Sequence, residues 1–129
     1  MALGERAVAA LPELMERAGD RVRAAYEATL AYVKERKAFG QPIGSFQHNK
    51  FKIAELVTKI EVAEAYIDDC VEAHANGKLT PIDAAKAKWY SSDTQGEILD
   101  HCVQLYGGYG FMNEYRVARA WRDARVTRI

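Results

Sequence analysis

Apolar residues recur at helical spacing along most of the chain, and no segment shows convincing alternation of apolar and polar residues. Residues 2–18 are rich in alanine and leucine, which favours a helix. Residues 21–37 carry apolar side chains three and four positions apart, which predicts a second helical segment, with a break or kink at Gly19-Asp20. A long apolar stripe from Phe46 to Val71 predicts another helix.

Start and stop signals delimit the later helices. Ser45 is predicted to cap the helix over residues 46–75, and Gly77 is predicted to be its C-cap. Thr80 before Pro81 predicts the start of a helix that extends past Val103, and a shorter helix is expected over residues 115–127. Short connections favour antiparallel neighbours, so residues 1–129 are predicted to form one all-α domain, an up-and-down antiparallel helical bundle.

Composition and charge narrow the choice of partners. The formal net charge is +0, so no nucleic-acid partner is expected, and no apolar run reaches the length of a membrane span. The N-terminus lacks the apolar core of a signal peptide and the composition of a transit peptide, which predicts a cytoplasmic protein. Cys70 and Cys102 lie on apolar helical faces and are predicted to be buried free thiols, with a disulfide as the minor alternative.

The histidines and the C-terminal arginines predict neither a metal site nor a nucleic-acid site. The spacing of His48, His74 and His101 contains no Glu-x-x-His pair, so no metal site is predicted. Five arginines recur every third residue from position 116 to 128, a spacing that drifts around a helix. We expect a solvated helix with ion pairs to Glu114 and Asp123, ahead of a nucleic-acid stripe. The aromatic residues Trp89, Tyr90 and Trp121 are expected in the core or at an interface.

Residues 101–111 join the end of an amphipathic helix to three glycines within four residues, namely Gly107, Gly108 and Gly110. One glycine is enough to end a helix. Three, interleaved with aromatic residues, are typical of a main chain that lies against a flat or anionic group. A roomy helix end with a turn is the alternative, and the local pattern leaves both open.

Residues 32–47, the glycine segment and Trp121–Arg125 together resemble the C-terminal helical domain of the acyl-CoA dehydrogenase family. The likeness covers residues 26–129 and in wording is most similar to the long-chain branch. It is carried by the order and spacing of Arg36, Phe39, Gly40, Pro42, Ile43, Gln47, Gln104, Gly107, Gly108 and Gly110.

The resemblance implies an FAD site. It implies that Arg36 touches the FAD pyrophosphate, that Phe39 lies along the adenine side, and that Gln47 contacts FAD. From the residues alone, Arg36 could instead cap the first helix, Phe39 could be a core residue, and Gln47 could be a polar residue of the first helical turn. The family's clamp on adenine and ribose corresponds to residues 104–108 and reaches the FAD of a neighbouring subunit, which implies a site built across a dimer interface. The implied cofactor-binding residues are Arg36, Phe39, Phe46, Gln47, Gln104, Leu105, Tyr106, Gly107 and Gly108.

The resemblance also implies a reaction and partners. Family members oxidise an acyl-CoA with FAD and pass electrons to an electron-transfer flavoprotein, as homodimers or homotetramers. In the long-chain branch the catalytic base lies on the first helix of this domain, at a position where this chain has Ala10. The nearest carboxylates are Glu5, Glu13 and Glu16, and the sequence around them does not match the family. No catalytic residue is therefore predicted.

The family's N-terminal helical domain, middle β-domain and final helix have no counterpart in these residues. We therefore expect a domain or fragment of an FAD-dependent acyl-CoA dehydrogenase that is inactive alone and self-associates through uncovered apolar faces. A non-enzymatic helical module for oligomerisation or scaffolding is the alternative.

Overall fold

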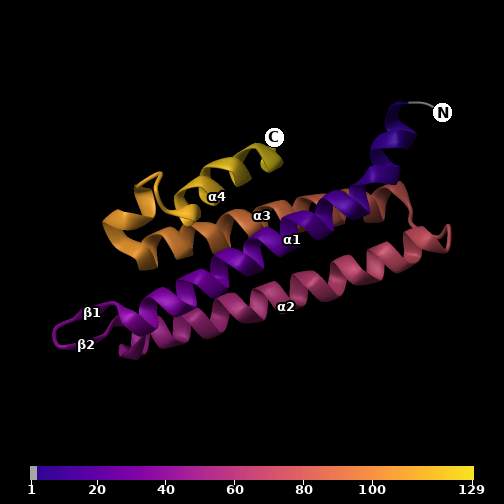
Figure 1. The fold of residues 1–129 in the computed structure, drawn as a ribbon. Coiled ribbons are helices and arrows are strands. Elements are labelled where there is room, and N and C mark those ends of the chain that lie inside the picture. The colour runs from indigo at the N-terminus through magenta and orange to yellow at the C-terminus, as the bar shows by residue number, and fades with distance from the viewer. Residues whose placement is uncertain (1–2) are drawn as a thin grey trace.

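The computed structural model describes the backbone of residues 3–129 and the side chains of Glu13 and residues 15–129. Three long helices, α1, α2 and α3, run side by side in alternating directions, and α4 folds back over α3 (Figure 1). This arrangement confirms the predicted all-α antiparallel bundle. The elements in order are α1 (Leu3–Glu35), β1 (Lys37–Ala38), β2 (Gln41–Pro42), η1 (Ile43–Ser45), α2 (Gln47–Ala75), α3 (Pro81–Tyr106), η2 (Gly107–Phe111), α4 (Arg116–Ala124) and η3 (Arg125–Arg128).

The main hydrophobic core lies where all four α-helices meet. Its buried side chains are Val22, Tyr26, Leu56, Ile60, Ile98, Cys102 and Val117. Cys70 and Cys102 are both buried and unpaired, which confirms the prediction of free thiols. Burial raises the pKa of the Cys102 thiol above its usual value, so this group stays neutral and inert near pH 7. Among residues 3–129, no helix combines the length and apolar character needed to cross a bilayer.

Helix α1 continues through Gly19-Asp20, so the predicted break there is wrong. One glycine in a helix costs about 1 kcal/mol, which is less than burial of a large apolar side chain contributes. Met15 and Val22 on either side of it are both buried in the bundle. Packing of α1 against its neighbours therefore outweighs the local preference.

A small hairpin separates α1 from α2, and the sequence pattern did not predict it. Lys37 pairs with Pro42 and Ala38 with Gln41. The two residues at its tip both have positive φ, 55° at Phe39 and 80° at Gly40, as in the type I′ turn that joins two-residue hairpins. Because each strand has only two residues, there is no alternation to detect, and α1 ends at Glu35 rather than Lys37.

Helix starts were predicted with mixed success. Thr80 is the N-cap of α3, and its Oγ1 accepts a hydrogen bond of 3.1 Å from the backbone N–H of Asp83, as predicted. Ser45 does not cap α2, so that prediction is wrong: Phe46 is the N-cap without a side-chain bond. The Ser45 hydroxyl instead donates to the Pro42 carbonyl at 2.6 Å, because residues 43–45 form a 3₁₀ turn of their own.

The end of α2 lies close to where it was predicted. Its C-cap is Asn76, and Gly77 follows one position later with φ 67°. The backbone N–H of Gly77 donates to the carbonyl of His74 at 3.1 Å, and that of Lys78 to the carbonyl of Ala73 at 2.8 Å. Gly77 thus supplies the left-handed residue that ends the helix, one place beyond the C-cap itself.

The C-terminal arginines do not pair as predicted. Arg119 and Arg122 donate to Asn113, and Arg128 bonds Asp93 at 3.1 Å; among the described residues, no pair forms with Glu114 or Asp123. Asn113, which lies before α4, and Asp93 on α3 are closer to these arginines than Glu114 and Asp123 are. Trp121 packs on a core cluster, whereas Trp89 is 64% exposed, so the core alternative is wrong for Trp89.

Candidate surface site at the hairpin end of the bundle

The hairpin after α1 and the C-terminal end of α3 lie at the same end of the bundle (Figure 1). The rings of Tyr32 and Tyr106 stack with centroids 4.1 Å apart. The guanidinium carbon of Arg36 lies 5.6 Å from the centroid of the Tyr109 ring. Two sequence segments singled out separately, around Arg36 and around the glycines, are therefore neighbours within one chain. We call the surface formed by Arg36, Phe39, Phe46, Gly107–Gly108 and Tyr109 the hairpin-end patch.

Arg36 offers an exposed cation held at its backbone. Its N–H donates to the Tyr32 carbonyl at 2.8 Å, and its carbonyl accepts from the Ile43 N–H at 2.8 Å. Among the residues whose side chains are described, no carboxylate pairs with the guanidinium, and none of the described side-chain hydrogen bonds joins it to a carbonyl of α1. Arg36 directly follows the last residue of α1, so its charge can complement the helix dipole, and the guanidinium still keeps its donors for an anion.

Phe39 presents an aromatic ring to solvent from the tip of the hairpin. It is 96% exposed, so the core alternative is wrong for this residue. Its φ of 55° is uncommon for a residue with a side chain and costs free energy that Asn or Gly would avoid. The ring meets Phe46 edge to face, with centroids 6.4 Å apart and planes at 87°. Apart from this contact with Phe46, the ring faces solvent, so a flat group could stack on it.

The three glycines have different reasons to be glycine. Gly107 ends α3 with φ 65° and ψ −141°, a conformation reserved for glycine. A Cβ on Gly110 would lie 2.5 Å from the Val103 carbonyl oxygen, so packing excludes any side chain there. Gly108 has neither reason: its φ is not positive, and a Cβ would meet nothing within 4 Å. The turn alone explains Gly107 and Gly110 and leaves Gly108 without an internal cause.

The remaining predicted residues divide into exposed and packed. Gln47 and Gln104 are exposed, and Gln47 follows Phe46 at the start of α2. Leu105 and Tyr106 are partly buried and pack on the main core, and burial raises the pKa of Tyr106. Their side chains thus contribute to the core, and Tyr106 also lines a hollow between α1, α3 and α4. Sequence analysis missed Tyr109, although its place among the glycines was a signal.

Of the carboxylates considered in the sequence, the two whose side chains are described, Glu13 and Glu16, assemble no acid-base site. Glu13 and Glu16 are exposed, and Glu13 pairs with Arg17 at 2.6 Å on the same helix. The side chains of Glu5 and Ala10 lie outside the described residues. Among the described residues, no group of three metal-ligating side chains is placed to hold a metal ion.

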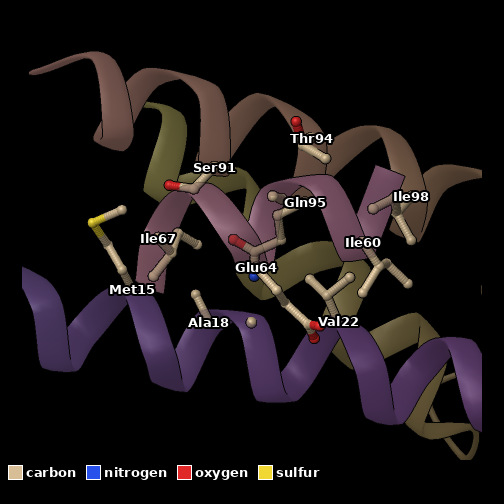
Figure 2. Close-up of a pocket in the computed structure, with 12 residues that line it drawn as sticks. Met15, Ala18, Val22, Ile60, Glu64, Ile67, Ser91, Thr94, Gln95 and Ile98 are labelled. Atoms are coloured by element: carbon tan, nitrogen blue, oxygen red, sulfur yellow. The ribbon is translucent and has the colours of Figure 1, made fainter. Parts of the chain in front are cut away.

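Two hollows elsewhere in the bundle do not include the patch residues Arg36, Phe39 or Gly108. One, of about 30 Å³, lies between α1, α2 and α3, and apolar side chains line it together with the polar residues Glu64, Ser91, Thr94 and Gln95 (Figure 2). A volume of this size has room for a few water molecules at most. The other, of about 600 Å³, runs between α1, α3 and α4. A third, of about 330 Å³, lies beside the hairpin between the end of α1, residues 42–45 and α2. It too is not lined by Arg36, Phe39 or Gly108, so a ligand seated on the patch needs walls from other groups.

Comparison with known proteins shows which family this domain belongs to. Residues 12–129 match the family described as "Acyl-CoA dehydrogenase, C-terminal domain". The chain is 45% identical over 101 residues to the mitochondrial long-chain specific acyl-CoA dehydrogenase of Sus scrofa, covering 78% of this chain and 24% of that protein. It is 40% identical over 102 residues to the caffeyl-CoA reductase-Etf complex subunit CarC of Acetobacterium woodii, covering 79% of this chain and 27% of that protein.

A solved structure matches the whole fold. The acyl-CoA dehydrogenase from Geobacillus kaustophilus superimposes with a TM-score of 0.92 at 32% sequence identity, over 98% of this chain and 33% of that one. The chain thus spans about a quarter of the length of the curated relatives named above.

Proposed function

Because the chain belongs to the acyl-CoA dehydrogenase family, whose members are FAD-dependent oxidoreductases of fatty acid metabolism, we propose that it serves as the C-terminal domain of such an enzyme and binds the diphosphate and adenosine half of FAD. The observation that carries the proposal is the contact of Arg36 with Tyr109, the residue after Gly108, at the end of the bundle where the hairpin exposes Phe39. Arg36, Phe39 and Gly108 each have a feature that the isolated fold does not need.

The chemistry of these groups fits the cofactor. The planar guanidinium of Arg36 matches the geometry of a diphosphate, with which it can form paired charge-assisted hydrogen bonds. Gly108 lets the backbone approach the adenosine without a side chain in the way. Phe39 offers a flat apolar face for the adenine ring. FAD, when bound, supplies the hydride-accepting flavin; the residues of this chain hold it and do not react.

The rest of the enzyme is proposed from the family. The substrate is an acyl-CoA, the electron acceptor an electron-transfer flavoprotein, and the assembly a homodimer or homotetramer in the cytoplasm, in which the patch of one copy contacts the FAD of its neighbour. The name of the relative CarC, a subunit of an Etf complex, supports the electron acceptor. Because no catalytic base is assigned, the chain alone is proposed to be inactive; turnover of an acyl-CoA with FAD and an electron acceptor by the pure chain would contradict this.

An NMR titration of the ¹⁵N-labelled chain tests the proposed half-site. ADP carries the diphosphate and adenosine of FAD, whereas riboflavin carries only the flavin and ribityl part. We expect millimolar ADP to shift the amide signals of Gly107 and Gly108 and the side-chain Nε–H signal of Arg36, and riboflavin to leave them unchanged. Arg36→Ala should abolish the shifts, and Arg21→Ala, which removes an exposed arginine within α1, should keep them.

The opposite result has a definite meaning. If ADP causes no localised shifts, or if its binding is unchanged in Arg36→Ala, this end of the bundle is not a nucleotide site. That outcome would favour the alternative of a helical oligomerisation or scaffold module.

A further inference from the structure

Four tyrosines form a continuous row that ends beneath Arg36. Tyr32 stacks on Tyr106 at 4.1 Å, and Tyr106 meets Tyr115 at 5.9 Å. Tyr115 lies 5.4 Å from Tyr109, and the Arg36 guanidinium carbon lies over the ring of Tyr109 at 5.6 Å. The row joins α1, the end of α3, the η2 turn and the residue that precedes α4. Its last member therefore has a fixed position on which a flexible arginine can rest.

The η2 turn fixes Tyr109 from its own side as well. Gly110, the next residue, is buried so close to α3 that a Cβ there would lie 2.5 Å from the Val103 carbonyl oxygen. The carbonyl of Tyr109 accepts a hydrogen bond of 3.1 Å from the Met112 N–H. The Tyr109 ring is nevertheless 40% exposed, so one part of it faces solvent at the patch.

A ring and a carboxylate hold an arginine in different ways. A carboxylate takes up N–H donors at the edge of the guanidinium, and those donors are then lost to a ligand. An aromatic ring attracts the flat face of the cation and leaves all five N–H groups at its edge. Among the described residues, Arg36 has the second kind of partner and lacks the first.

We propose that Tyr109 is a positioning residue, which holds the guanidinium of Arg36 by its face so that the N–H edge is presented to the diphosphate. This inference rests on the proposed function, and it assigns a role to a residue that the sequence pattern left aside. The ring does not touch the phosphate in this arrangement; its effect passes through Arg36.

The test compares Tyr109→Phe, which keeps the ring, with Tyr109→Leu and Tyr109→Met, which remove it. The first readout is spectroscopic: the side-chain protons of Arg36 should show an upfield ring-current shift in the wild type and in Tyr109→Phe, lost in the other two. The second is ADP affinity from the NMR titration. An exposed cation–π contact supports a loss of about two- to fivefold without the ring, and no loss with Phe.

The outcomes separate this inference from the proposed function. If Arg36→Ala leaves ADP binding unchanged, the proposed function fails. If Arg36→Ala weakens binding while Tyr109→Leu and Tyr109→Met bind ADP as the wild type does, the site stands and the positioning role is overturned. The same holds if the Arg36 protons show no ring-current shift in the wild type. Unchanged amide signals of α2, remote in sequence from Tyr109, serve as the control for folding.

Discussion

Alanine substitutions at the three glycines should separate the needs of the fold from those of a ligand. Each substitution adds one methyl group within the same four-residue stretch, so composition and helix propensity change equally. The structure predicts a loss of stability at Gly110 from a clash, a loss at Gly107 from backbone strain, and none at Gly108, where neither obstacle is present. The series therefore tests the assignment of Gly108 to an external group, with the other two glycines as matched controls.

The expected costs follow from the local geometry. At Gly110 the new Cβ would lie 2.5 Å from the Val103 carbonyl oxygen and 3.0 Å from the Tyr106 Cβ, and both obstacles lie close to the backbone. Overpacking of this kind costs about 1–3 kcal/mol. At Gly107 the space is open, but φ 65° with ψ −141° costs a residue with a side chain about 1–3 kcal/mol.

Gly108→Ala should leave the free energy of unfolding within about 0.5 kcal/mol of the wild type, as for surface substitutions that break no contact. Its open surroundings provide no clash, and its φ provides no strain. Binding should nevertheless weaken, because the methyl group stands where the adenosine is proposed to approach the backbone. Stability and binding thus change independently at this position.

Equilibrium urea unfolding, followed by circular dichroism at 222 nm, measures the three free energies, and the ADP titration measures binding. The reasoning is refuted if Gly108→Ala destabilises the chain as much as Gly110→Ala does. It is also refuted if Gly108→Ala binds ADP as tightly as the wild type.

Three further substitutions test other parts of the structure. Thr80→Ala should lower the free energy of unfolding by about 1 kcal/mol by removing the cap that accepts from the Asp83 N–H, and Thr80→Ser should restore it; urea unfolding of both variants decides this. The pKa of Glu64 is lowered, chiefly by hydrogen bonds from Arg23, so its stabilising effect is present above the unfolded-state pKa and disappears as pH falls through the folded-state pKa. Glu64→Gln should therefore reduce the loss of stability on the acid side of a plot of the free energy of unfolding against pH. The reduction should be less than about 1 kcal/mol because the pair is partly exposed, and an unchanged slope would contradict this. Phe39→Asn should raise the free energy of unfolding by about 0.5–1 kcal/mol, because Asn tolerates positive φ, and should weaken ADP binding; a less stable variant would show that the exposed ring serves the fold.

The bundle could be predicted from the sequence because its signals are local and repeated. The apolar stripe of α2 spans many turns, and the start of α3 depends on residues within three positions of one another. The prediction for Ser45 was wrong because a hydroxyl before a helix can either cap that helix or bond the preceding backbone. The 3₁₀ turn that favours the bond to Pro42 depends on tertiary contacts. The hairpin went unnoticed because two-residue strands leave no periodic pattern.

The site could be predicted only in part. Family resemblance pointed to Arg36 and the glycines, but not to the contact of Arg36 with Tyr109, which joins segments far apart in the sequence. The hydrogen bond from the Tyr32 hydroxyl to the Tyr106 carbonyl spans 74 residues. The proposed role of Tyr109 depends on its contact with Arg36, which only the folded structure shows. The reason for each glycine likewise required three-dimensional neighbours, because the sequence does not distinguish Gly108 from Gly110.

The central claim is that the diphosphate of the cofactor lies against Arg36 and the Gly107–Gly108 backbone. Paramagnetic relaxation by Mn²⁺ bound to ADP tests it most directly, because the metal ion sits on the diphosphate and broadens only nearby signals. With Mn²⁺ alone as the control, we predict the strongest broadening at the Arg36 side chain and at the amides of residues 107–109. Strongest broadening in the groove between α1, α3 and α4, or none specific to ADP, would contradict the claim.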